Sequence, residues 1–335
     1  MDLDCPEQPP SYYTFCLHSI AFFSFPINCL GCYLIICKSS HSEYKYRQLY
    51  LQIVSFIVEN HMTWLGAGYY YYPMFGGYNT SPILSHVISP HTNVIGLVFV
   101  LAFELPSLVS CFQFRAKSAG ELRPTNKISP YFTNFMTFIA HCFPFILSIS
   151  IFLSEPSHEE QYEFISQHFP KCLHLLKNPD FIVYDWRTNL GWIIAAASAV
   201  IWVITFALYS LSLSIYTILT LHTMRCHMSA TTYKIHRSAL IALTFQCIIP
   251  FSCILAPISM IGIILLQELS QLQELATDLW FLIAAHSMAS TIVMICFNSR
   301  YLDFVRTFFS RAFKINGVEV VSSSSNDAIV FRKYG

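Results

Sequence analysis

Ionisable side chains inside apolar segments are the first candidates for chemistry in this chain. Glu59, Glu104 and His286 each lie within a stretch of mostly apolar residues. If these stretches cross a membrane, each charge costs about 2.5–3.5 kcal/mol on insertion scales, which makes such a residue a functional candidate by default. The plainer alternative is a hydrogen bond between neighbouring helices without any contact to a ligand. The residues alone leave both interpretations open.

Helical spacing arranges the polar residues of these stretches in stripes, because side chains three or four positions apart share one face of a helix. The stripes are Gln52, Ser55, Glu59, Thr63 and Gly66, then Asn93, Val100, Glu104 and Ser107, and finally His286, Ser287, Ser290 and Thr291. We expect these faces to point into a helix bundle. The predicted ligand pocket contains Glu59, His91, Gln246 and His286.

Two prolines lie on the same helical face as Gln246. Pro250 and Pro257 follow it at offsets of four and eleven residues. Proline removes a backbone hydrogen bond and kinks a helix, so this segment could act as a hinge, although kinks also occur in static bundles. The candidates for a conformational switch are Glu104, Pro250, Pro257 and Tyr301.

Motifs of the common enzyme classes are missing from the sequence. It contains no His-Glu-x-x-His, no Gly-rich phosphate loop and no nucleophile elbow, and it has just 11 glycines. No basic run carries interleaved aromatic residues on a polar background, the pattern that would indicate nucleic-acid binding. We therefore expect a protein that is not an enzyme, binds no nucleic acid and needs no metal or cofactor.

The composition is that of a membrane protein. Of the 335 residues, 54% are hydrophobic and 11% are charged, and the mean hydropathy is +0.50. Soluble domains carry roughly 25% charged residues. A helix that crosses the bilayer needs about 20 mostly apolar residues. Segments that qualify are 13–37, 49–72, 86–111, 131–153, 190–219, 238–266 and 277–297. The sequence thus predicts an all-α membrane protein, a seven-transmembrane helix bundle over residues 13–297.

Basic residues set the orientation of this bundle. All but three of the 19 Lys and Arg residues fall on one side, and the exceptions are Lys171, Lys177 and Arg187. Because basic loops stay in the cytoplasm, residues 1–12 should be extracellular and the C-terminus cytoplasmic. Residues 298–316 alternate basic and apolar side chains at helical spacing, which predicts an amphipathic helix in the inner interface of the lipid bilayer. We expect residues 317–335 to be a disordered cytoplasmic tail.

The predicted outer side carries two covalent candidates. Asn79 begins the one Asn-x-Ser/Thr glycosylation sequence, with Thr80 and Ser81. Of the 12 cysteines, Cys5 and Cys172 fall clearly on this side. An oxidising compartment could pair them, and two free thiols are the alternative.

Two segments carry a resemblance to a known family. They are YKIHRSALIALTFQCIIPFSCILAP, from Tyr233 to Pro257, and HSMASTIVMICFNSRY, from His286 to Tyr301. On these residues the chain resembles the nematode serpentine chemoreceptors of the broad Str-type superfamily, closest to classes I and H. Where the family more often has Pro-Tyr-Arg after the seventh helix, this chain reads NSRYL over residues 298–302.

The resemblance implies a seven-transmembrane G-protein-coupled receptor in the plasma membrane of a sensory cilium. Such a receptor binds a small external odorant or soluble chemical and activates a heterotrimeric G protein. A cytosolic groove would then face the G protein with Arg115, Lys117, Arg225, Lys234 and Arg237. These roles are expectations that rest on the family.

Other classes of membrane protein remain as alternatives. Odorant-gated seven-span ion channels place the N-terminus inside, against the distribution of basic residues here. A transporter would show broken helices in matching halves, and the sequence has no such symmetry. A member of the family that does not signal is the third alternative.

Overall fold

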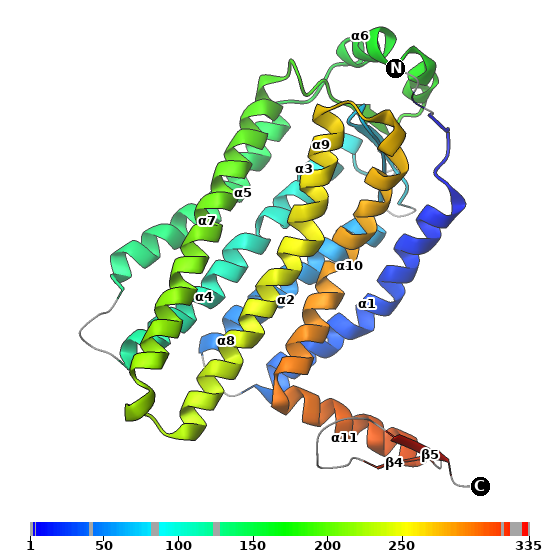
Figure 1. Cartoon of the computed structure of the whole chain (residues 1–335). Helices are drawn as coiled ribbons and strands as arrows, with labels where there is room; N and C mark the ends of the chain where they lie inside the picture. Colours follow the sequence, from blue (N-terminus) through cyan, green and yellow to red (C-terminus); the bar gives the residue numbers. More distant parts are fainter. Residues whose placement is uncertain are drawn as a thin grey trace.

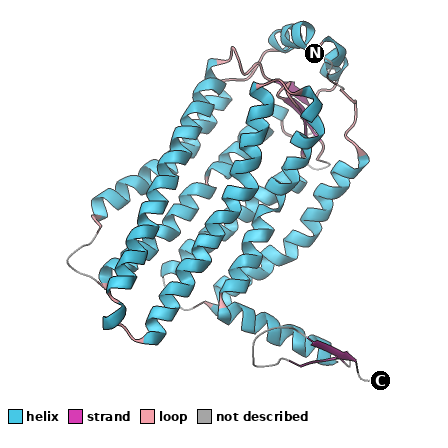
Figure 2. Cartoon of the chain, in the orientation of Figure 1, coloured by secondary structure: helices cyan, strands magenta, loops and turns pink. Residues whose placement is uncertain are grey.

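The chain is a bundle of long helices with a small sheet at one end (Figures 1 and 2). A computed structural model describes residue 3 and residues 5–39, 43–81, 87–122, 128–315, 318–321 and 330–333. Within this part, six helical stretches are long and apolar enough to cross a membrane: Ser11–Lys38, Pro90–Glu121, Pro130–Phe152, Leu190–Thr223, Leu240–Leu266 and Ser270–Phe297. With α2 (Glu43–Asn60) they form the helical bundle that the sequence predicted.

Two helices hold the bundle together. The bundle elements besides α2 are α1 (Ser11–Lys38), α3 (Pro90–Ala102), α4 (Glu104–Glu121), α5 (Pro130–Phe152), α7 (Leu190–Thr223), α8 (Ala230–Pro250), α9 (Ala256–Leu266) and α10 (Gln273–Phe297). Helix α10 packs against α1, α2, α8 and α9, while α4 packs against α2, α5 and α7. The two ends of the bundle differ. We call the end with the sheet and α6 (His158–His168) the cap end, and the end with α11 (Ser299–Ile315) the basic end.

The predicted second span, 49–72, is wrong at its far end. Helix α2 is followed by a π-helical turn, His61–Leu65, which closes with the Gly66 N–H donating to the His61 carbonyl at 2.7 Å. Residues Gly68–Tyr71 are then strand β1. Glycine disfavours a helix and tyrosine favours a strand, so the helix ends where the Gly-Ala-Gly-Tyr sequence begins.

Prolines interrupt two other predicted spans. In the third, Phe103 separates α3 from α4, and Pro106 has no N–H to continue the ladder of hydrogen bonds. In the sixth, Pro250 and Pro257 flank a π-helical turn, Phe251–Leu255, between α8 and α9. Such turns appear where a helix accommodates an irregular hydrogen-bond pattern.

The cap end is built from strands and short helices. Strands β1, β2 (Gly76–Asn79) and β3 (Phe181–Val183) form an antiparallel sheet in that order. Helix α6 begins with a capping box between Ser157 and Glu160, in which each side chain binds the other residue's backbone N–H. A 3-10 helix, Pro170–Lys177, follows it.

The C-terminal part leaves the bundle at the basic end (Figure 1). The predicted amphipathic helix over residues 298–316 coincides with α11, whose observed bounds are Ser299–Ile315. Strands β4 (Val318–Val321) and β5 (Val330–Lys333) pair antiparallel, so the prediction of a disordered tail is wrong for these residues. Both segments contain valine, whose branched side chain favours an extended backbone.

Candidate functional site

A buried network of hydrogen bonds joins α1, α2 and α10 around Asn28. Its Oδ1 accepts hydrogen bonds from Gln52 Nε2 at 2.9 Å, Ser287 Oγ at 3.0 Å and Thr291 Oγ1 at 2.6 Å. Its Nδ2 donates to Glu59 Oε2 at 3.2 Å. All five side chains are buried. The network therefore fixes three helices to one another by polar contacts away from solvent.

A second buried contact joins α4 to α10. His286 Nε2 lies 3.0 Å from Glu104 Oε1, and His286 Nδ1 lies 2.6 Å from the Ile283 carbonyl oxygen. Ser55 Oγ donates to the other carboxylate oxygen of Glu104 at 3.0 Å. Both ring nitrogens of His286 thus face acceptors, an arrangement that satisfies both when the ring is protonated.

The predicted inward stripes of α2 and α10 are confirmed. Gln52, Ser55, Glu59 and Thr63 are all buried, as are His286, Ser287, Ser290 and Thr291. Glu59 and His286, predicted for one pocket, lie in neighbouring parts of this buried set, and Glu104, predicted for the switch, pairs with His286.

The other two predicted pocket residues lie elsewhere. His91, at the start of α3, has Nδ1 at 2.8 Å from the Tyr184 hydroxyl and Nε2 at 3.4 Å from the Phe152 carbonyl oxygen, so it ties α3 to the ends of β3 and α5. Gln246 on α8 is 3% exposed, and its Oε1 makes no hydrogen bond within the described residues. Among the described residues, no hydrogen bond joins His91 or Gln246 to the Asn28 network.

Tyr301 holds the start of α11 against the bundle. It is fully buried with Leu34, Ile35 and Met294, and its hydroxyl lies 2.7 Å from Ser39 Oγ. Tyr301 therefore couples α11 to the ends of α1 and α10, and its role in a switch stays a prediction.

The predicted G-protein-facing residues lie at the basic end. Lys117, Arg225 and Arg237 are exposed. Arg115 is half-buried over the ring of Tyr44, with 3.7 Å between the guanidinium carbon and the ring centroid. The side chain of Lys234 lies outside the described part of the chain.

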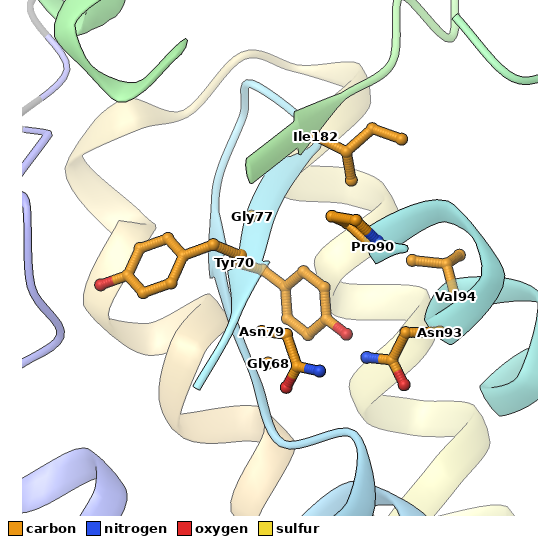
Figure 3. Close-up of a pocket in the computed structure, with 9 residues that line it drawn as sticks. Gly68, Tyr70, Gly77, Asn79, Pro90, Asn93, Val94 and Ile182 are labelled. Atoms are coloured by element: carbon orange, nitrogen blue, oxygen red, sulfur yellow. The ribbon is translucent and has the colours of Figure 1, made fainter. Parts of the chain in front are cut away.

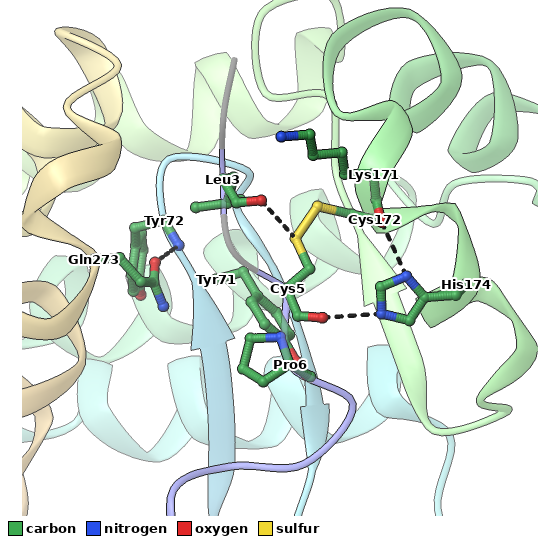
Figure 4. The surroundings of a disulfide bond; sticks show 9 residues. All are labelled: Leu3, Cys5, Pro6, Tyr71, Tyr72, Lys171, Cys172, His174 and Gln273. Carbon is green, nitrogen blue, oxygen red and sulfur yellow. Dashed lines mark hydrogen bonds between the residues drawn. A yellow bond between two sulfur atoms is a disulfide. The ribbon is translucent and has the colours of Figure 1, made fainter.

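A disulfide joins Cys5 to Cys172 at the cap end, with 5.5 Å between the Cα atoms (Figure 4). His174 Nε2 lies 2.9 Å from the Cys5 carbonyl oxygen, and the Tyr71 hydroxyl donates to the Pro6 carbonyl at 2.5 Å. The N-terminal segment is therefore fastened to both the 3-10 helix and β1.

Two small adjoining cavities lie beneath the sheet. One is lined by Gly68, Tyr70, Gly77, Tyr78, Asn79, Pro90, Asn93, Val94 and Ile182 (Figure 3), and the other by Tyr13, Leu17, Met62, Gly66, Gly68, Tyr70, Leu97 and Trp280. Each has a volume of about 10 Å³, which is room for about one water molecule. Neither is lined by a residue predicted for the pocket.

The position of Asn79 argues against a glycan there. Asn79 lies in β2, is 8% exposed and has its Nδ2 buried. Its Oδ1 accepts a hydrogen bond from the Ser81 N–H at 2.9 Å. A sugar on Nδ2 would have to displace neighbouring atoms, so the burial of Asn79 disfavours a glycan there, and its use as an acceptor site stays a prediction.

Sequence reasoning missed the sheet and therefore missed Tyr70 and Asn79 as cavity residues. The signal was the segment GYYYYPMFGGYN, in which tyrosines and glycines flank a proline over residues 68–79. Short aromatic runs bounded by Gly and Pro are typical of hairpin strands. The same run lies at the end of an apolar stretch, where it was counted as helix.

Comparison with known proteins places this chain in a family. No curated protein matches the chain. The family model described as serpentine type 7TM GPCR chemoreceptor Sri matches residues 3–305. This match covers the disulfide, the sheet and the whole bundle. The chain therefore belongs to the serpentine type 7TM GPCR chemoreceptor family Sri.

Proposed function

We propose that this chain is a chemosensory receptor that binds a small external molecule near the cap end and activates a heterotrimeric G protein at the basic end. The observation that carries the proposal is the buried polar network on α1, α2, α4 and α10, which lies between a cross-linked cap and an exposed basic surface. Family membership supports the same role.

The proposed mechanism is a shift between two arrangements of the helices. A ligand can favour one arrangement only by binding it more tightly than the other. The α8–α9 segment is suited to move because its π-helical turn lies between two prolines. Its movement relative to α4 and α10 would change the surface that carries Lys117, Arg225 and Arg237.

The proposed orientation places the cap end outside the cell and the basic end in the cytoplasm. The distribution of Lys and Arg supports it, because basic loops stay cytoplasmic. Display at the plasma membrane of a sensory cilium is a further expectation from the family, which imaging of the tagged full chain in sensory neurons would check.

The test is a screen of small volatile and soluble chemicals on cells whose surface display of the full chain has been verified. The readout is G-protein dissociation by energy transfer. We expect a response that is lost when Arg225→Glu and Arg237→Glu reverse the charges at the basic end. Lys177→Glu, which makes the same change at the cap end, should leave it intact.

One result would overturn the proposal. A chemical that evokes a membrane current in cells lacking G proteins, unchanged by the Arg225→Glu and Arg237→Glu reversals, would make the chain a ligand-gated channel.

A further inference from the structure

The cavity beneath the sheet contains a buried donor that no described residue accepts from. Asn79 Nδ2 is buried and makes no hydrogen bond within the described residues. The side chains of Asn79 and Asn93 are 8% and 5% exposed, and Asn93 Nδ2 donates to the Gly66 carbonyl at 3.3 Å. Leaving a buried donor without a partner is unfavourable, so the Asn79 amide nitrogen favours the arrival of a group that can accept a hydrogen bond.

The two amides face the same space. Figure 3 shows the side chains of Asn79, from β2, and Asn93, from α3, pointing toward one another across the cavity. The Tyr70 side chain lies over Gly68, where an added Cβ would come within 2.6 Å of the tyrosine hydroxyl. Glycine at that position thus leaves room for the phenol beside the two amides.

The adjoining cavity is apolar. Leu17, Met62, Leu97 and the Trp280 ring line it, and it shares Gly68 and Tyr70 with the polar cavity. The rings of Tyr70 and Trp280 are 4.9 Å apart between centroids. Because Tyr70 borders both spaces, a rotation of its side chain would join them into one site.

None of the residues that line the two cavities is charged. A buried ion without a partner is strongly disfavoured, so the lining selects against carboxylates and ammonium groups.

We infer that these two cavities open into one binding site for an uncharged small molecule, with a hydroxyl, carbonyl or primary amide held by Tyr70, Asn79 and Asn93 and an apolar remainder against Leu17, Met62, Leu97 and Trp280. The inference rests on the proposed function, since it names the ligand class of that receptor. It assigns recognition to the sheet and α3 rather than to Glu59 and His286.

The experiment measures binding without any G protein, so its failure is separate from failure to signal. The full chain is purified in detergent, and its thermal unfolding midpoint is followed with butanol, butanone, butyramide, butyrate, butylammonium or pentane. We expect the three uncharged polar probes to raise the midpoint in a saturable way. Butyrate, butylammonium and pentane should not.

Two variants test the site itself. Tyr70→Phe removes the hydroxyl and keeps the ring against Trp280, so it should weaken butanol binding about two- to tenfold, the effect of one neutral hydrogen bond. Gly68→Ala should weaken binding, because the added methyl would occupy space at the residue that lines both cavities. Tyr131→Phe is the matched control, since Tyr131 is 86% exposed on α5.

Three outcomes would overturn the inference. If no probe raises the midpoint, the cavities are places for single water molecules. If the probes bind Tyr70→Phe as tightly as the unchanged chain, they bind elsewhere. If the intact mass of the purified chain shows a glycan removed by a glycosidase specific for Asn-linked sugars, Asn79 is not available to a ligand.

Discussion

A buried carboxylate and a buried imidazole hold α4 to α10 through the contact between Glu104 and His286. Removing one partner of such a pair leaves the other buried without compensation, which costs more than the pair contributes when intact. Ser55 and the Ile283 carbonyl complete the hydrogen bonds of the two side chains, so the contact is satisfied as it stands.

We predict that Glu104 and His286 are energetically coupled. Glu104→Gln, His286→Asn and the double variant should give an interaction energy of about 0.5–3 kcal/mol in thermal unfolding, because the two single changes disrupt the same contact. The pair Glu104 and Ser238 is the control, since Ser238 is exposed on α8 and contacts the Phe297 carbonyl instead. Additive effects of Glu104→Gln and His286→Asn would refute the coupling.

The burial of single residues could be predicted from the sequence, but their partners could not. The spacing of polar residues at three and four positions correctly predicted that Glu59, Glu104 and His286 face the interior of the bundle. This spacing depends on local helix geometry alone. It could not pair Glu104 with His286, which are 182 positions apart. Pairing depends on the depth and rotation of each helix, and these are set by packing across the bundle.

At the scale of elements, α1 and α10 approach one another closely at Gly31. A Cβ at Gly31 would lie 2.6 Å from Thr291 Cγ2. Small residues allow helices to pack closely in membranes. Here the close approach also brings Thr291 within hydrogen-bond distance of Asn28.

Gly31→Ala is therefore expected to destabilise the bundle by about 1–3 kcal/mol, the usual cost of overpacking. Gly262→Ala is the matched control, because nothing lies within 4 Å of a Cβ added there. It should be neutral or stabilising, as alanine is the better helix former. Thermal unfolding of the purified variants measures both, and equal effects would mean that the α1–α10 contact is not tight.

Helix α6 at the cap end offers a prediction with pH. The hydrogen bonds from Ser157 lower the pKa of the Glu160 carboxyl below its usual value. A lowered pKa contributes stability that is present above the ordinary pKa of about 4.3 and is lost as the pH falls through the lowered pKa. Hydrogen exchange of the α6 amides should therefore show a loss of protection in acid.

Two neighbouring variants separate this effect from general acid sensitivity. Glu160→Gln keeps a capping side chain without a titrating group, so the acid-dependent loss should flatten. Glu159→Gln removes a carboxylate from the same first turn outside the capping box and should leave the loss unchanged. The same pH profile in both variants would assign the loss to some other group.

The helices were predictable from the sequence, and strand β1 was not. Long apolar segments predicted six spans to within a few residues at most ends, because the bilayer imposes their length. The strand at Gly68–Tyr71 was missed, since its tyrosines belong equally to an apolar helix or to a sheet. Only β2, which lies next to it in space, decides between them.

At the scale of the whole molecule, the two ends carry different chemistry. The cap end is cross-linked and rich in aromatic rings, and the basic end exposes Lys117, Arg225 and Arg237. Epitope tags at the two termini, probed in intact and in permeabilised cells, test the orientation. We expect the N-terminal tag to be accessible in intact cells and the C-terminal tag only after permeabilisation. Both tags on one side would contradict an odd number of spans.

The disulfide belongs to this scale because it fastens the N-terminus across the cap. Loss of a native disulfide typically costs 2–5 kcal/mol, so Cys172→Ser should lower both thermal stability and surface delivery. Cys226→Ser is the control, because Cys226 is a free, exposed cysteine at the basic end. Peptide mapping under non-reducing conditions that found Cys5 and Cys172 as free thiols would remove the basis of the prediction.

The separation of these two cysteines has a consequence for biosynthesis. They are 167 positions apart, and α1 to α6 are made between them. At about 5–20 residues per second, the ribosome reaches Cys172 roughly 10–30 s after Cys5. Helices α1 to α6 are thus synthesised while the first thiol is still unpaired, and the cap is the last part of this half of the receptor to close. A newly made chain is therefore open to thiol-dependent quality control throughout that interval.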